Sequence, residues 1–278
     1  MIQAHGLTKR YPQIAALNGI SFSVEAGEIF GFLGPNGAGK TTTIKILTGQ
    51  VRPTGGRASV AGIDVVTDRE RLHHVIGVVF DIPTLYEEHT ALRNLTLFCD
   101  LYGEPRRRAD ELLESVGLGA VAKRPVRKMS RGMKQRVMIA RALIPNPRVL
   151  FLDEPTGGLD PESAADLKRL IRRLADGGTT VFLTTHRMEV ADQLCSRVAI
   201  VDHGRVIAVA SPEALKRRNA IPLVQVELRD GSRVTLPLSD GQLGARLHDL
   251  GEQGIERIQT IEPTLEDVLL SLTGRGRQ

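Results

Sequence analysis

A glycine-rich segment with the spacing of a phosphate-binding loop runs from Gly34 to Thr41 and reads GPNGAGKT. It fits the pattern G-x-x-x-x-G-K-[ST] and follows an apolar stretch, Ile29–Leu33, that is typical of a buried strand. Glycines let the backbone wrap closely, so that its N–H groups can converge on phosphate oxygens, and the positive end of the following helix adds to this attraction. We expect a nucleotide to be held by Gly34, Asn36, Gly37, Ala38, Gly39, Lys40, Thr41 and Thr42.

Two side chains at the end of this loop have the chemistry that a bound triphosphate requires. Lys40 can neutralise charge on the β- and γ-phosphates during hydrolysis, and the hydroxyl of Thr41 can bind Mg²⁺. The alternative is a glycine-rich turn without a ligand. The strand pattern before the loop and the helical pattern after it favour the phosphate site.

A second apolar run, Val149–Leu152, ends in two carboxylates, Asp153 and Glu154. A buried strand here would bring Asp153 beside the phosphate loop, where it can hold Mg²⁺ through water. Glu154 would then lie next to a water that attacks the γ-phosphate, and we assign it as general base or water-orienting group. Solvated carboxylate pairs after strands are common, but the phosphate loop earlier in the chain favours the catalytic interpretation.

The segment Lys128–Arg136, KMSRGMKQR, distinguishes among phosphate-loop proteins, which include kinases, helicases and GTPases. It resembles the signature of the ABC ATPase superfamily, L-S-G-G-Q followed by a basic-Gln-Arg run, and like that signature it lies just before the second carboxylate motif. Ser130 and Gly132 match. The departures from the commonest letters are Met129, Arg131 and Met133. The form S-x-G-M-K-Q-R is familiar among ATPases of drug and polysaccharide exporters.

This resemblance implies a dimer that is held together by ATP. Ser130 is a natural N-cap, and Gly132 lets the backbone approach an anion. In one chain this helix start has no phosphate to bind, whereas in the head-to-tail dimer of the family it closes over the γ-phosphate held by the other chain. A second copy of the chain is therefore an expected partner. The alternative interpretation is an ordinary capped helix.

The resemblance also assigns roles to three isolated positions. Tyr11 matches the aromatic residue that stacks on adenine. Asp160, at the end of Gly158-Leu159-Asp160, matches the loop through which the two subunits communicate and joins the nucleotide-binding set. His186 matches the switch histidine, which at a strand end could reach the γ-phosphate and hold Glu154 and the water in place. We count Glu154, His186 and Lys40 as the expected catalytic residues.

One position departs from the family in charge. The family usually has Gln after the strand at Gly77–Phe80, where this chain has Asp81. A glutamine would bind Mg²⁺ and water through a neutral carbonyl, whereas Asp81 can bind the metal but adds negative charge near the phosphates. The expected metal ligands are therefore Thr41, Asp153 and Asp81, and we expect activity to be retained.

These motifs must be positioned by an α/β fold, because short β-branched runs alternate with helical patterns. We expect residues 1–219 to form an ABC ATPase core with an antiparallel β subdomain and a helical insertion at about 84–145. The strictly alternating stretch Ile20–Val24 ends at Ala26-Gly27, which is typical of a hairpin turn. Residues 220–278 are expected to form a small α+β appendage, with a hairpin around Asp230-Gly231 and a helix that begins at a Thr264–Asp267 capping box and ends near Gly274.

The composition is that of a soluble protein that reaches a membrane through a partner. Of 278 residues, 41% are hydrophobic, which is enough for a core, and the apolar runs are far shorter than a membrane span. The net charge is +5 and aromatic residues make up only 4%, so we expect no nucleic-acid partner. Cys99 and Cys195 are expected to be buried reduced thiols.

We therefore expect a Mg²⁺-dependent ATPase subunit of an ABC exporter, peripheral on the cytoplasmic face of the cell membrane, that drives a separate membrane permease. The tail segment Glu262–Leu269 resembles the C-terminal extension of daunorubicin-type exporter ATPases. The main alternative is a non-transport ABC ATPase that acts on ribosomes or DNA. The single phosphate loop disfavours the ribosome-acting members, which usually fuse two ATPase halves. The lack of sustained heptads disfavours the DNA-repair members, which insert long coiled coils. A small-molecule kinase would have no use for the signature segment.

Overall fold

The computed structural model describes residues 1–219, 223–238, 241–261 and 263–273. The chain divides into two compact units, Met1–Val209 and Ala210–Gln278. The first unit contains two sheets and the second contains one, and the first carries every residue to which we assigned a role in nucleotide binding. The predicted α/β fold class is confirmed, while the predicted domain limits at 219 and 220 stay a prediction.

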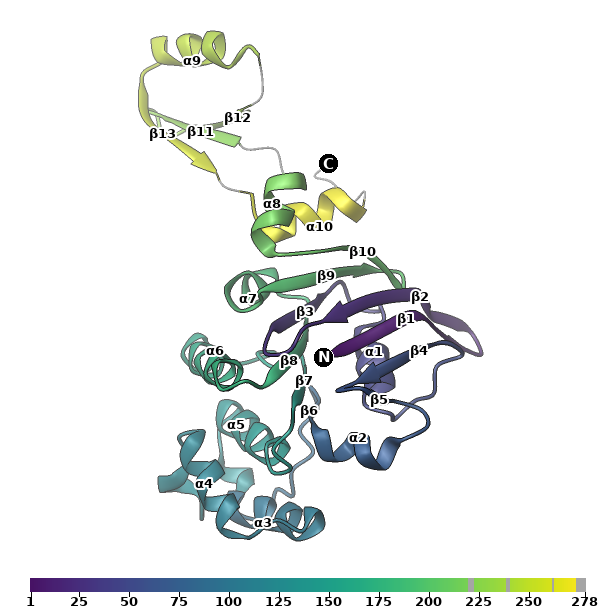
Figure 1. The fold of residues 1–278 in the computed structure, drawn as a ribbon. Helices are drawn as coiled ribbons and strands as arrows, with labels where there is room; N and C mark the ends of the chain where they lie inside the picture. Colours follow the sequence, from purple (N-terminus) through teal and green to yellow (C-terminus); the bar gives the residue numbers. More distant parts are fainter. Residues whose placement is uncertain (220–222, 239–240, 262, 274–278) are drawn as a thin grey trace. The chain divides into compact units, whose positions relative to one another are not determined.

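A six-stranded sheet with the order β10-β9-β3-β8-β7-β6 forms the centre of the first unit (Figure 1). Its strands are β3 (Ile29–Leu33), β6 (Ile76–Val79), β7 (Val149–Asp153), β8 (Thr180–Thr185), β9 (Arg197–Asp202) and β10 (Arg205–Ala210). The pairs β3/β8, β3/β9, β6/β7 and β7/β8 are all parallel. Every residue of β3, β7 and β8 is buried, as expected for parallel strands that are covered on both faces.

A second sheet of four strands packs against the first and has the order β2-β1-β4-β5. It consists of β1 (Ile2–Tyr11), β2 (Ile14–Val24), β4 (Gly55–Val60) and β5 (Ile63–Asp64), and its paired strands are antiparallel. Phe22 of β2 stacks on Phe30 of β3, with ring centroids 5.8 Å apart, and both rings meet Phe182 of β8. The shared aromatic core fixes one sheet over the other.

The hairpin that we predicted at Ala26-Gly27 is wrong. A turn does occur there, but it passes the chain from β2 in the four-stranded sheet to β3 in the six-stranded sheet, and those two strands are not neighbours. The partner of β2 is β1, with Tyr11 opposite Ile14 at the tight connection. Alternation of apolar residues identified the strand correctly, but it carries no information about which strand becomes its neighbour.

Helices lie along the six-stranded sheet of the first unit (Figure 1). They are α1 (Lys40–Leu47), α2 (Arg69–Val75), α3 (Ala91–Tyr102), α4 (Arg107–Ser115), α5 (Arg131–Ala142), α6 (Pro161–Asp176) and α7 (Met188–Leu194), with 3₁₀ turns at Gly119–Val121 and Val126–Lys128. Helices α3, α4 and α5 contact one another and form a helical layer between β6 and β7 in the sequence. Within the described residues, no helix combines the length and apolarity needed to cross a bilayer.

The second unit contains α8 (Pro212–Asn219), β11 (Leu223–Leu228), β12 (Arg233–Pro237), α9 (Leu243–Glu252), β13 (Ile255–Ile261) and α10 (Leu265–Thr273). The predicted hairpin is confirmed, since β11 pairs with β12 in antiparallel register. The capping box is confirmed as well, because the Thr264 backbone N–H donates to Asp267 Oδ2 at 3.0 Å and the Asp267 N–H donates back to Thr264 Oγ1 at 3.2 Å. The predicted stop at Gly274 lies outside the described residues.

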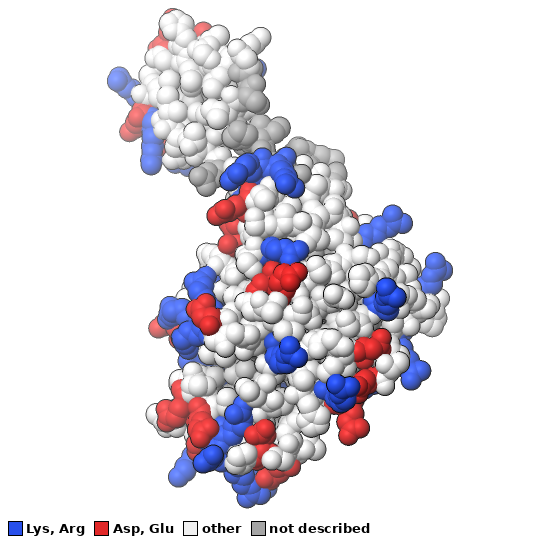
Figure 2. Space-filling view, viewed as in Figure 1, with Lys and Arg blue, Asp and Glu red and all other residues white. Residues whose placement is uncertain are grey.

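Charge is spread over the surface in both signs. Figure 2 shows basic and acidic side chains interspersed on the face in view, with no broad single-sign area. This distribution accords with a modest net charge of +5. Solubility is the property that such a surface supports.

Both cysteines are free and buried, which confirms the prediction of two reduced thiols. Burial raises the pKa of the Cys99 thiol, and it raises that of Cys195 still further. Because the thiolate is the reactive species, we expect iodoacetamide at pH 8 to label neither residue in the native protein and both in concentrated guanidinium chloride. A Ser115→Cys variant, with its thiol at an exposed position, is the positive control. Rapid labelling of the native wild type, measured by mass spectrometry, would contradict the expectation.

Candidate functional site

The phosphate loop lies between the end of β3 and the first residue of α1. Gly39 is the N-cap of α1 and has a φ of 103°. A Cβ atom at Gly39 would lie 2.6 Å from Leu17 Cδ2 and 2.7 Å from the Ala16 carbonyl oxygen, so only glycine can occupy this position. No side chain caps α1, and the N–H groups of its first turn therefore remain available to an anionic ligand.

The ammonium group of Lys40 lies at the base of the loop and is buried, with 7% of the residue exposed. It donates to the carbonyl oxygens of Gly34 at 2.8 Å and Pro35 at 3.2 Å. It also lies 3.5 Å from Glu154 Oε1. The lysine thus links the phosphate loop to the acidic end of β7.

Asp153, at the end of β7, is 3% exposed and accepts hydrogen bonds from two hydroxyls. Thr41 Oγ1 donates to its Oδ2 at 2.9 Å, and Thr184 Oγ1 donates to its Oδ1. The first contact unites the phosphate loop and β7, as the spacing of the motifs led us to expect. The second involves a residue that the sequence analysis missed. Only the parallel register, which places Asp153 opposite Thr184, identifies it.

Thr184→Val is expected to lower the free energy of unfolding by about 1–3 kcal/mol, because it leaves a buried carboxylate oxygen with one hydrogen bond fewer at nearly unchanged volume. Urea unfolding followed by circular dichroism measures the change. Thr184→Ser retains the hydroxyl and is expected to lose much less. Equal loss in both variants would assign the effect to packing rather than to the hydrogen bond.

Glu154 follows directly and has an unusual backbone conformation, with a φ of 48°. Its N–H donates to the Thr184 carbonyl oxygen at 3.1 Å, which ties the turn to β8. A non-glycine residue in the left-handed region is strained, and such strain is often found where a side chain is held for function. The side chain is 16% exposed.

His186 approaches Glu154 from the end of β8. Its Nδ1 lies 3.0 Å from Glu154 Oε1, and its backbone N–H donates to Oε2 at 3.4 Å. Oε1 is buried, and among the described residues it accepts no hydrogen bond with good alignment, so its capacity as an acceptor is retained. Lys40 and His186 therefore flank one carboxylate, as the sequence analysis had grouped them.

A cavity of about 410 Å³ opens beside these groups. The predicted residues that line it are Tyr11, Asn36, Gly37, Gly39, Lys40, Thr41, Thr42, Asp81, Asp153 and Glu154. Tyr11 is 41% exposed at the end of β1, and Lys9 Nζ lies 5.0 Å from the centre of its ring. The cavity thus joins a loop suited to phosphates with an exposed aromatic ring at its rim.

Six predicted residues are not among those that line this cavity: Gly34, Ala38, Ser130, Gly132, Asp160 and His186. Ser130 is the N-cap of α5 and its hydroxyl accepts from the Met133 N–H at 3.2 Å. Asp160 is the N-cap of α6, where hydrogen bonding to Ser163 lowers the pKa of its carboxyl group. A Cβ atom at Gly132 would lie 2.7 Å from Ser163 Oγ, so this glycine is also needed for the close packing of α5 on α6.

The donor chemistry at the loop suits Mg²⁺. Thr41 Oγ1 and Asp153 Oδ2 are hard oxygen ligands that already lie within 2.9 Å of each other. Asp81 faces the same cavity, but its nearest charged partner is Arg131, with Nη2 and Oδ1 3.8 Å apart. Across the described ranges, no three His, Cys, Asp or Glu side chains come together as a ready metal cluster. Phosphate oxygens would have to complete the coordination.

Comparison with known proteins places this site in context. Residues 17–157, which include the phosphate loop and both carboxylates, match the family model described as "ABC transporter". A fluoroquinolones export ATP-binding protein of Mycobacterium tuberculosis is 42% identical, and the alignment covers 99% of this chain and 94% of the relative. A daunorubicin resistance ATP-binding protein of Streptomyces coeruleorubidus is 40% identical, and the alignment covers 100% of this chain and 97% of the relative.

Solved structures with the same fold are ABC transporter cassettes, and some of them are described as dimeric or as bound to nucleotide. A post-hydrolysis dimer of an ATP-binding cassette, bound to ADP and phosphate, is 30% identical, with a TM-score of 0.69 over 76% of this chain and 98% of that chain. The protein cbiO1 from Clostridium perfringens, described as part of the ABC transporter complex cbiONQ, is 29% identical, with a TM-score of 0.72 over 78% of this chain and 90% of that chain. These similarities bear on the fold and on the kind of chemistry the site can perform.

Proposed function

Because the chain belongs to the ABC transporter family, where ATP hydrolysis is the shared activity, we propose that it energises a separate permease which exports antibiotic-like small molecules. It is an ATP-binding, ATP-hydrolysing subunit of exporter type. The observation that carries the proposal is the grouping of Lys40, Glu154 and His186 beside the Thr41–Asp153 pair. The printed names of the relatives support the cargo class.

The phosphate loop holds the nucleotide in this proposal. Backbone N–H groups at the start of α1 bind phosphate oxygens, and Lys40 moves from its carbonyl partners to the β- and γ-phosphates. Thr41 and Asp153 would hold Mg²⁺, and Asp81, the third predicted ligand, would have to leave Arg131 to join them. When bound, the metal neutralises phosphate charge. Tyr11 stacks on adenine at the rim of the cavity.

Glu154 accepts the proton of the attacking water as that water bonds to the γ-phosphorus, while the bond from this phosphorus to the β–γ bridging oxygen breaks and ADP leaves with the electron pair. The support is its acceptor Oε1, which lies within reach of both Lys40 and His186. His186 orients the carboxylate through its ring and its backbone N–H. Lys40 stabilises the charge that develops on the phosphate oxygens. Thr184 acts behind these groups by orienting Asp153.

A second copy of the chain completes the site. Ser130 and Gly132 at the start of α5, and Asp160 at the start of α6, are absent from the lining of the chain's own cavity. In a head-to-tail dimer they close over the nucleotide held by the partner, as the dimeric architecture of the related cassettes suggests. ATP is then the ligand that favours the closed state over the open one.

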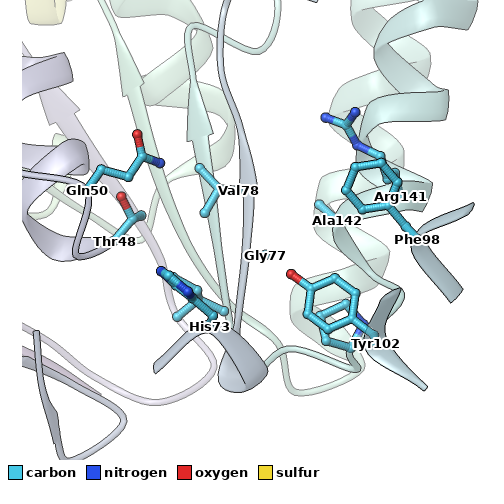
Figure 3. A pocket seen from close by; sticks show the side chains of 11 residues that line it. Thr48, Gln50, His73, Gly77, Val78, Phe98, Tyr102, Arg141 and Ala142 are labelled. Carbon is cyan, nitrogen blue, oxygen red and sulfur yellow. The ribbon is translucent and has the colours of Figure 1, made fainter. Parts of the chain in front are cut away.

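The permease is proposed to dock at a hollow between α2, α3 and α5 (Figure 3). This hollow, of about 140 Å³, is lined on one side by His73 and on the other by Phe98, Tyr102 and Arg141. Two leucines of α3, the helix that supplies Phe98 and Tyr102 to the hollow, are exposed, Leu97 at 38% and Leu101 at 75%, and exposed apolar groups are typical of an interaction surface. Docking there would place the chain at the inner face of the membrane.

The experiment is affinity purification of the tagged chain from detergent-solubilised membranes. We expect ATP turnover that requires Mg²⁺ and recovery of an integral membrane protein. Leu101→Glu is expected to reduce that recovery without changing the turnover of the isolated chain, whereas Ile207→Glu, at an exposed position on β10, should leave recovery unchanged. Recovery of ribosomes in place of a membrane protein would contradict the proposal. Loss of drug resistance in a deletion strain tests the cargo class.

A further inference from the structure

Three carboxylates and one ammonium group line the nucleotide cavity, so negative side chains outnumber the positive one at a site that must accept a triphosphate. Glu154 is 3.5 Å from Lys40, and Asp153 is buried with two hydroxyl donors. Asp81 is different, since 53% of its side chain is exposed and its ion-pair partner is Arg131 rather than Lys40 of the phosphate loop. Its charge must be offset from outside the loop if it is not to repel phosphate.

Arg131 supplies that charge from a distant part of the chain. It is the first residue of α5, directly after the Ser130 cap, and its Nη2 lies 3.8 Å from Asp81 Oδ1. The guanidinium also covers the loop that follows Glu154. A Cβ atom at Gly158 would lie 2.5 Å from Arg131 Nη1, and one at Gly157 would lie 3.5 Å from Asp81 Oδ1. The Arg131 guanidinium, the Gly157-Gly158 loop and the Asp81 carboxylate therefore lie next to one another in space.

We propose that Arg131 is a positioning residue for the nucleotide site of its own chain, and that it acts by pairing with Asp81 and holding that carboxylate against the Gly157-Gly158 loop and away from the phosphates. The inference rests on the proposed binding of ATP in this cavity. Both partners are more than half exposed, so the pair adds little to the stability of the fold. Its effect is on the charge that an incoming nucleotide meets.

The test measures the affinity of the full chain for ATP with EDTA present, at protein concentrations where it is monomeric, so that neither metal nor a partner contributes. Arg131→Met is expected to weaken binding about three- to tenfold at low ionic strength, because one carboxylate loses its countercharge. The defect should shrink as salt is added. Arg131→Lys keeps the charge and should bind nearly as the wild type does.

The double variant Arg131→Met/Asp81→Asn decides the mechanism. If Arg131 acts through Asp81, removing the carboxylate restores affinity to within about twofold of the wild type, since the repulsion is gone. A double variant as weak as Arg131→Met would overturn the proposal and indicate direct contact between Arg131 and nucleotide. Unchanged affinity in Arg131→Met would overturn it too.

Arg127→Met is the matched control. Arg127 pairs with Glu88 at 3.3 Å, is 55% exposed and does not line the cavity, so its loss should leave ATP affinity unchanged. Failure of the wild-type chain to bind ATP at all would refute the proposed function. Once the wild type is shown to bind ATP, only the affinities of the Arg131 variants decide whether Arg131 acts through Asp81.

Discussion

Glu154→Gln is expected to lower ATP turnover by about 10²–10⁴-fold, the usual contribution of a general base, while ATP binding is retained. Glutamine has the same shape but cannot accept a proton from water. The buried Lys40 then loses a negative neighbour at 3.5 Å, so its charge acts more fully on the γ-phosphate. Binding without hydrolysis should therefore hold the two subunits together, and a stable ATP-bound dimer is the second expected result.

Steady-state phosphate release and size-exclusion chromatography with ATP measure the two effects. Glu162→Gln, at an exposed position in the first turn of α6, makes the same chemical change without touching the cavity and should behave as the wild type. Normal turnover by Glu154→Gln would refute the assignment of the base. Low turnover without a dimer would leave the base in place but refute ATP as the ligand that closes the pair.

Two inactive variants, Lys40→Met and Ser130→Arg, are expected to restore activity when their subunits are mixed. Lys40→Met should weaken ATP binding about tenfold or more, because a charged hydrogen-bond donor to phosphate is lost. Ser130→Arg places a bulky cation at the start of α5 and should block closure over the partner's nucleotide. In a mixed dimer, one site receives both intact residues and the other receives neither.

Random mixing makes about a quarter of all composite sites intact, so turnover should rise from near zero towards that fraction of the wild-type value. Mixing two batches of the same variant is the negative control, and Lys45→Met, elsewhere on α1, controls for loss of a lysine. No recovery, in samples where mass spectrometry confirms mixed dimers, would contradict sites shared between subunits. Full activity in either variant alone would contradict the residue roles.

The parts of the fold that could be predicted are those fixed by neighbours in the chain. The loop from Gly34 to Thr41 needs glycine for its backbone and follows a strand, so its place between β3 and α1 is set by local spacing. The strands β7 and β8 are continuous apolar runs because they are covered on both faces. The Thr264–Asp267 capping box is local as well, and it is confirmed.

The remainder depends on which segments become neighbours in space. Alternation around Phe22 identified β2 but not its pairing with β1, and β13 was missed because its side chains are mostly exposed and do not alternate. Thr184 reaches Asp153 only through strand register. The Asp81–Arg131 pair joins a loop to a helix far along the chain. The sequence analysis noted both residues as departures from the family pattern, but nothing in the sequence indicated that they are in contact.

The contacts of Lys40 have a consequence for how tightly the site can hold its substrate. An ammonium group has three hydrogens, and here two of them are bonded to the Gly34 and Pro35 carbonyls while the third side faces Glu154. Arrival of a triphosphate exchanges these bonds for others and forms few that are new. The contribution of Lys40 to affinity is the difference between these two sets of bonds and is smaller than the full strength of its bonds to phosphate, which suits an enzyme that must release ADP after every cycle.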